Sequence, residues 1–112
     1  MARNVLPLDR YEAQMVLVPA PEGEGSTVEA LRIVVFGPNF PQRAIEPELL
    51  IGPEIALRTS IARDQRSIQG FFFKLPPGGE PIRVRYGDSQ EGELRERFSR
   101  ERVRPLSRVC EG

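Results

Sequence analysis

Hydrophobic and polar positions alternate along much of the 112-residue chain, in short runs that end at proline or glycine. The clearest run is IRVRY, in which Ile82, Val84 and Tyr86 would face one side of an extended strand and Arg83 and Arg85 the other. Eleven prolines and ten glycines separate such runs, which are rich in Val, Ile, Phe and Thr. Runs of this composition between turn residues are typical of strands joined by tight turns. The pattern therefore predicts an all-β chain, with no helix before residue 90.

Six strands are expected in the first 86 residues. Their ranges are 14–18, 28–37, an extended piece near Ile45 that leads into 49–51, then 55–61, 68–75 and 82–86. In the fourth of these, Ile55, Leu57, Thr59 and Ile61 are expected to share one side of a single strand.

The segment 90–104 leaves two alternatives open. Its composition favours a short C-terminal helix, with Leu94 and Phe98 four positions apart on one side. A last strand through Phe98 and Val103 fits the segment equally well. Short strands spaced about ten residues apart, without crossover helices, predict an antiparallel sandwich or barrel.

The order of the turns resembles that of a known family. The turn-rich stretch PAPEGEGS precedes a strand that ends in a corner at Gly37 and Phe40. Ile51-Gly52, SIQGFFFKLPPGG and PIRVRYGDSQEG then follow in order. Over residues 19–92 this order resembles the IPT/TIG branch of immunoglobulin-like (E-set) domains. The resemblance implies an immunoglobulin-like antiparallel β-sandwich of about seven short strands. Members of the family act as spacers, dimerisation units, DNA-contacting platforms and sugar-associated modules, so the resemblance does not choose a function.

Length and charge indicate one small domain with no strongly charged partner. A chain of 112 residues is too short for two domains and long enough to bury a core without disulfides. We expect a single domain over 1–112, with 1–12 and 105–112 loosely ordered. The 16 basic and 16 acidic residues balance, which gives no argument for nucleic acid or an anionic membrane as partner. With no membrane-length apolar run and no signal-peptide pattern at the start, a cytoplasmic protein is expected.

The chain offers little for catalysis or metal binding. It has no histidine, which excludes Ser-His-Asp and Cys-His arrangements, and its single cysteine, Cys110, excludes an internal disulfide and a paired-cysteine metal site. Phosphate-binding glycine motifs are absent. Asp88, Glu91 and Glu93 are close in sequence, but their spacing is not that of a known calcium loop. We therefore expect no enzyme, no cofactor and no metal ion.

The same alternation predicts an apolar outer surface on one sheet. It turns Val34 and Phe36 away from the core in the second predicted strand, and Phe71 and Phe73 in the fifth. In an immunoglobulin-like sandwich these two strands share a sheet, so the four side chains would lie together. A patch on the order of several hundred Å² is at the upper limit for a soluble monomer. A second copy of the chain or a different protein would cover it.

Two other readings of these phenylalanines stay open. The tail can fold back over the patch through Leu94 and Phe98, or a bulge at Gly70 can exchange the positions of Phe71 and Phe73. The favoured hypothesis is a non-catalytic protein-interaction or assembly module, homodimeric through this face or bound to another protein.

An alternative hypothesis uses the arginine-rich surface. Arg83 and Arg85, with Tyr86 as an aromatic platform, would bind nucleic acid or a carbohydrate. The acidic residues interleaved with the arginines favour a solvated, self-paired surface instead, so nucleic acid is the less favoured partner.

Overall fold

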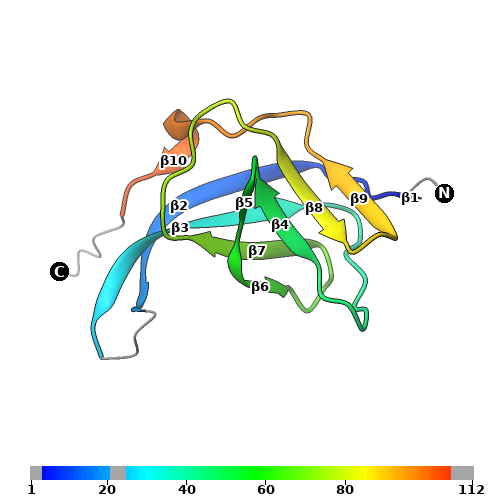
Figure 1. Ribbon diagram of the computed structural model, residues 1–112, viewed down its shortest axis with the longest axis horizontal. Helices are drawn as coiled ribbons and strands as arrows, with labels where there is room; N and C mark the ends of the chain where they lie inside the picture. The colour runs from blue at the N-terminus through cyan, green and yellow to red at the C-terminus, as the bar shows by residue number, and fades with distance from the viewer. Residues whose placement is uncertain (1–3, 21–24, 107–112) are drawn as a thin grey trace.

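The computed structural model describes residues 4–20 and 25–106, which form two five-stranded sheets (Figure 1). The elements are β1 (Asn4–Val5), β2 (Arg10–Pro19), β3 (Thr27–Phe36), β4 (Glu48–Ile51), β5 (Glu54–Ile55), β6 (Leu57–Ile61), β7 (Ser67–Phe72), β8 (Ile82–Tyr86), β9 (Gln90–Glu93), the 3-10 turn η1 (Arg100–Arg102) and β10 (Val103–Arg104). One sheet has the order β1-β9-β8-β4-β5 and the other β10-β2-β3-β7-β6. The all-β class predicted from the alternation is confirmed.

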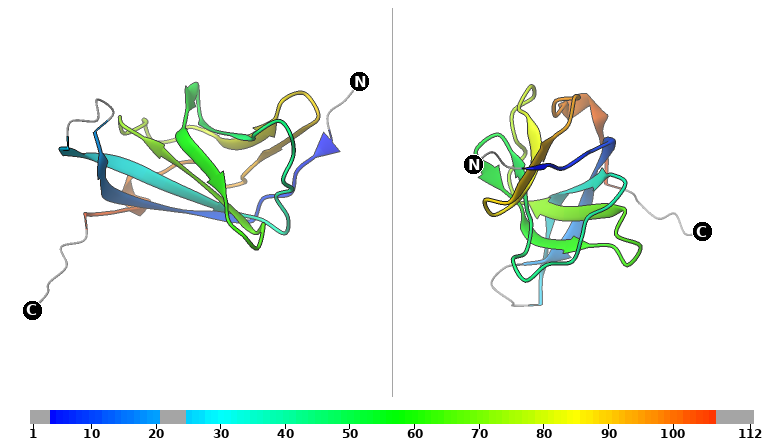
Figure 2. Two further views of the ribbon diagram at one scale, coloured as in Figure 1. Left: turned by 90° about the horizontal axis from the view of Figure 1, so that it is seen from below. Right: turned by 90° about the vertical axis from the view of Figure 1, so that its right-hand side faces the viewer.

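The two sheets face each other as the layers of a sandwich (Figure 2). The seven strands of four or more residues are β2, β3, β4, β6, β7, β8 and β9, and all their pairings are antiparallel. The two-residue strands β1 and β10 add parallel pairings, to β9 and β2 respectively. Numbered A to G, the seven longer strands follow the order A-B-E-D against C-F-G, as in a constant-type immunoglobulin sandwich. The predicted sandwich of about seven strands is confirmed.

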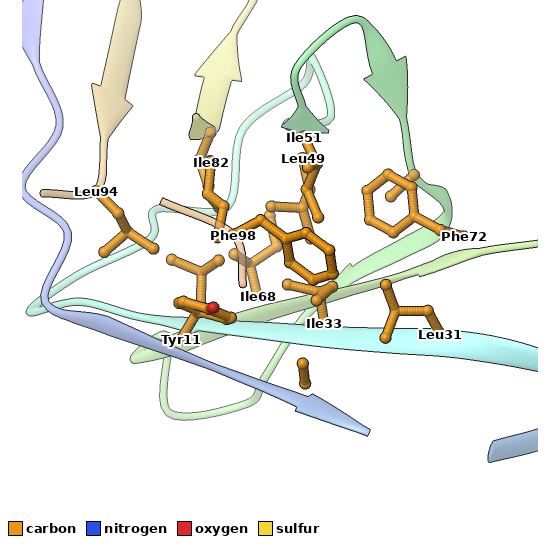
Figure 3. Packing of buried hydrophobic residues seen from close by; sticks show 14 of the residues in the cluster. Tyr11, Leu31, Ile33, Leu49, Ile51, Ile68, Phe72, Ile82, Leu94 and Phe98 are labelled. Carbon is orange, nitrogen blue, oxygen red and sulfur yellow. The ribbon is translucent and has the colours of Figure 1, made fainter. Parts of the chain in front are cut away.

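The core lies between the sheets and is filled by the inward positions of the alternating strands. Ile33 and Ile68 from one sheet face Leu49, Ile51 and Ile82 from the other, and all five side chains are fully buried (Figure 3). The inward positions of β3 and β8 are those that the sequence pattern predicts, because each strand keeps a regular two-residue period along its whole length.

The segment between β9 and η1 closes the sandwich. Leu94 and Phe98 insert into the core, where the Phe98 ring centroid lies 6.4 Å from that of Tyr11 (Figure 3). The Tyr11 hydroxyl accepts a hydrogen bond from the Ser99 N–H at 3.0 Å, which fixes the chain just before η1. The expected helix is therefore only the three-residue η1, and the expected last strand is only β10. The tail does not cover the outer face of a sheet with Leu94 and Phe98.

The predicted single strand over 55–61 is wrong. Ile55 belongs to β5, which pairs with β4, whereas Leu57 begins β6, which pairs with β7 in the other sheet. The chain crosses between the sheets at Ala56, whose N–H donates to the Leu49 carbonyl at 2.8 Å. The crossing buries Ala56 and leaves Ile55 and Leu57 exposed.

The N-terminal segment is part of the fold. Leu6 and Tyr11 are buried in the core, and Asn4–Val5 forms β1. Residues 1–3 and 107–112, with Cys110, lie outside the described residues. In the described part of the chain, no helix is long and apolar enough to cross a membrane.

Candidate interaction surfaces

The outer face of the β10-β2-β3-β7-β6 sheet carries Val34 and Phe36, as the alternation predicts, but the chain covers both. Val34 is only 8% exposed. Arg32 donates from Nε to Gln69 Oε1 at 2.9 Å, and both side chains line the same shallow hollow as Val34. The Arg10 guanidinium lies over the Phe36 ring at 3.9 Å from its centroid, a cation–π contact. Neither side chain offers a free apolar surface.

The sheet register also separates the predicted interface residues into two groups. Phe36 pairs with Ser67, whereas Phe71 pairs with Arg32, four positions further along the strands. At the rise of a β-strand this is about 13 Å. Val34, Phe36, Phe71 and Phe73 therefore do not form the single patch that the sequence analysis expected.

Phe71 and Phe73 instead join two exposed aliphatic residues at the edge of the sandwich. Leu57 lies directly opposite Phe71 in the β6–β7 pairing. Ile55 and Leu57 are 48% and 53% exposed, and the two phenylalanines are half-buried. The four line a hollow of about 190 Å³. It lies where β5 and β6, the edge strands of the two sheets, follow one another along the chain, as the ribbon in Figure 1 shows for the strands. We call Ile55, Leu57, Phe71 and Phe73 the edge patch.

The local sequence explains why the edge patch forms. Gly52, at φ 57°, turns the chain tightly after β4, and the two-residue β5 ends where the chain leaves its sheet at Ala56. Gly70 on β7 makes room for the crossing, because a Cβ there would lie 2.5 Å from the Ala56 Cβ. With Ala56 held inward against Gly70, the aliphatic residues on both sides of it turn outward.

Sequence reasoning missed Ile55 and Leu57 as surface residues, although one signal was present. The Gly52-Pro53 turn stands immediately before β5, which begins at Glu54. A hairpin at that turn makes Ile55 pair back with the strand that ends at Ile51, so 55–61 cannot be one continuous strand.

Two opposite charges flank the edge patch. Glu54 and Lys74 line the same hollow as the four apolar residues, and both are exposed. Within residues 4–20 and 25–106, neither of these two side chains has an ion-pair or hydrogen-bond partner. The Arg58 guanidinium lies 6.0 Å from the Phe73 ring centroid and donates to the Pro19 carbonyl at 3.4 Å.

The alternative surface, around Arg83 and Arg85, is occupied by its own carboxylates. Arg83 forms an ion pair with Glu91 at 3.1 Å, and Arg85 pairs with Glu48 at 2.8 Å. Glu93 lies directly opposite Arg83 in the β8–β9 register. A phosphate would have to compete with these carboxylates for both guanidinium groups.

Tyr86 does not lie on the same surface as the two arginines. Its ring is 1% exposed in the core, and its hydroxyl donates to the Pro41 carbonyl at 2.8 Å. Burial raises the pKa of the Tyr86 hydroxyl above its usual value, while the nearby Arg43 guanidinium acts in the opposite direction. A ring in this position has no face against which a sugar or base can stack.

No cluster suited to metal binding is present in the described part of the chain, where no three Asp, Glu, His or Cys side chains gather.

Comparison with known proteins adds no assignment: no protein-family model, no curated protein and no solved structure matches the chain.

Proposed function

We propose that this chain is a non-catalytic protein-interaction or assembly module that binds its partner through the edge patch. The observation that supports it is the gathering of Ile55, Leu57, Phe71 and Phe73 around one hollow at the meeting point of two edge strands. The strand order and the order of the turns support an E-set domain of the IPT/TIG type. A cytoplasmic location is part of the proposal, because a single cysteine gives no internal disulfide.

The energetics of the edge patch favour occupation by a protein. Completing the burial of four such side chains would contribute about 4 kcal/mol before the entropy of association is subtracted. Aromatic side chains in particular act as anchors at the centres of interfaces. The outer face around Arg83 and Arg85 offers no comparable gain, since its charges already pair within the chain.

The test is a double substitution in the patch, Leu57→Glu/Phe71→Glu. The introduced carboxylates would have to be buried on binding, so any association with a second copy or with another purified protein should weaken at least tenfold. Val5→Glu is the matched control, because Val5 is also an exposed aliphatic residue but lies on β1, at the other edge of its sheet. Association measured by light scattering or calorimetry that is unchanged in the folded double variant would refute the proposal.

A further inference from the structure

The charges around the edge patch are arranged so that they can pair with those of an identical patch. Glu54 precedes the patch on β5, and Lys74 follows it after β7. In a two-fold dimer each surface meets its own copy, so a residue contacts the partner's residue at a different position and is contacted in return. When one acidic and one basic side chain border the same apolar surface, a two-fold axis can therefore bring together two ion pairs, each between the acid of one copy and the base of the other.

The two charges beside the edge patch remain available to pair with another molecule. Two arginines on the sheets already pair with a carboxylate of the same chain, Arg10 with Glu12 at 2.9 Å and Arg85 with Glu48 at 2.8 Å. Glu54 and Lys74 have no such partner among the residues that the structure describes. Opposite charges that border an apolar hollow and stay unpaired within the chain complement a surface with the same pattern.

We propose that the partner bound at the edge patch is a second copy of this chain, in a two-fold dimer in which Glu54 of each copy pairs with Lys74 of the other. The inference rests on the proposed function, since it names the partner of the same surface. The apolar side chains supply the buried centre of the contact, and the Glu54–Lys74 pairs at its rim fix the orientation of the two copies.

The backbone of β6 determines the kind of contact. Arg58 has a left-handed φ of 55°, and the β6–β7 register shifts between Leu57 and Ser60. An irregular edge of this kind is a poor template for adding a strand. The two copies therefore pack side chain against side chain, with an aliphatic residue of one filling the hollow of the other, and do not form a continuous sheet.

The size of the contact predicts a modest affinity. A standard stable interface buries about 800 Å² per partner, which is about a tenth of the 7244 Å² surface of this chain. Four apolar side chains and two ion pairs form only the centre of such an area. We expect a dimer whose population rises with concentration over the micromolar range.

The experiment is a charge exchange followed by sedimentation equilibrium from about 1 to 500 µM. Glu54→Lys or Lys74→Glu alone turns both ion pairs of the two-fold dimer into pairs of like charge. Each single variant should therefore weaken the dimer about tenfold. The double variant Glu54→Lys/Lys74→Glu restores opposite charges and should return the dissociation constant to within about threefold of the wild type. Both positions are exposed, so circular dichroism and thermal unfolding should be unchanged in all three variants.

The outcomes separate this inference from the proposed function. A wild-type chain that stays monomeric at every concentration overturns the dimer. If the chain is monomeric but Leu57→Glu/Phe71→Glu still abolishes binding of another protein, the proposed interaction function stands without the dimer. A dimer that needs the patch but is not rescued by the charge exchange overturns the Glu54–Lys74 pairing. A dimer insensitive to both sets of variants overturns both proposals.

Discussion

The two edges of the β10-β2-β3-β7-β6 sheet differ in how regularly the backbone is built. At the β6 edge the register shifts between Leu57 and Ser60, and Arg58 adopts a left-handed conformation. At the opposite edge, β2 pairs with β3 over ten consecutive residues without any shift. Only one of these strands therefore presents a regular row of backbone groups to solvent.

The two edges also differ in what covers them. The short strand β10 pairs with β2 only at Ala13 and Gln14, and in the described residues no strand pairs with the rest of that side. The uncharged run MVLV over 15–18 follows, with Leu17 exposed, beside an open groove of about 360 Å³. Native sheets usually protect such an edge with a charge, a bulge or a proline. Of these three devices, the part of β2 after Gln14 has only Pro19, at the end of the strand.

The difference shows two separate routes by which an edge can attract a second chain. The irregular β6 edge offers side chains without a strand template, which suits specific docking through the edge patch. The regular β2 edge offers a strand template with few specific side chains, which suits non-specific strand addition. Substitutions that act on one edge should therefore leave the other unchanged.

Removing the space for the sheet crossing should have the largest effect. In Gly70→Val the new side chain would overlap Ala56, since even a Cβ lies 2.5 Å from the Ala56 Cβ. We expect a loss of about 3 kcal/mol in the free energy of unfolding, measured in urea. The edge patch should be lost as well, because Ala56 holds Ile55 and Leu57 outward.

The matched control for this substitution is Gly78→Ala. A Cβ at Gly78 has no atom within 4 Å, so the free energy of unfolding should stay within about 0.5 kcal/mol of the wild type. Equal stability of Gly70→Val and Gly78→Ala would show that the crossing does not depend on close packing against β7.

Introducing glycine at each edge should have opposite effects. Arg58→Gly relieves a left-handed conformation, which should raise the free energy of unfolding by about 1 kcal/mol, because the Arg58 contacts to Pro19 and Phe73 are long and exposed. Val16→Gly removes a half-buried side chain from a regular strand and should lower the free energy of unfolding by about 1–2 kcal/mol. Thermal and urea unfolding of both variants measure the sign of each change in the free energy of unfolding. A destabilised Arg58→Gly would show that the left-handed conformation of Arg58 is not strained.

The sequence pattern predicted the regular strands of the sandwich and missed the irregular edge at β5 and β6. The inward positions of β3 follow from alternation because both of its neighbours pair with it in register. The change of sheet at Ala56 depends on a hydrogen bond to Leu49 and on space next to Gly70, which are contacts between segments distant in sequence. A two-residue period in 55–61 contains no information about either contact.

The sequence pattern predicted the candidate interaction surface only in part, because it contains no contacts between distant segments. Alternation placed Phe71 and Phe73 on the outer side correctly. It did not reveal that Arg10 covers Phe36, because that contact depends on the pairing of β2 with β3. Two apolar residues four apart, Leu94 and Phe98, were compatible with helix and strand, and the hydrogen bond between Ser99 and the Tyr11 hydroxyl belongs to neither.

The smallest effect on stability is expected from a single charge on the regular edge. Leu17→Lys replaces an exposed side chain on β2, so the free energy of unfolding should change by no more than about 0.5 kcal/mol. The charge should nevertheless slow aggregation, because pairing two β2 edges would bring the lysines of the two chains close together in a dry contact. Turbidity of concentrated protein held below its unfolding temperature measures this rate. Leu57→Lys is the counterpart at the other edge, where the same chemical change should weaken the two-fold dimer and leave the rate of aggregation unaltered. If Leu57→Lys instead slowed aggregation as much as Leu17→Lys, the irregular backbone at Arg58 would not be what prevents strand addition at β6, and both edges would have to be treated as templates.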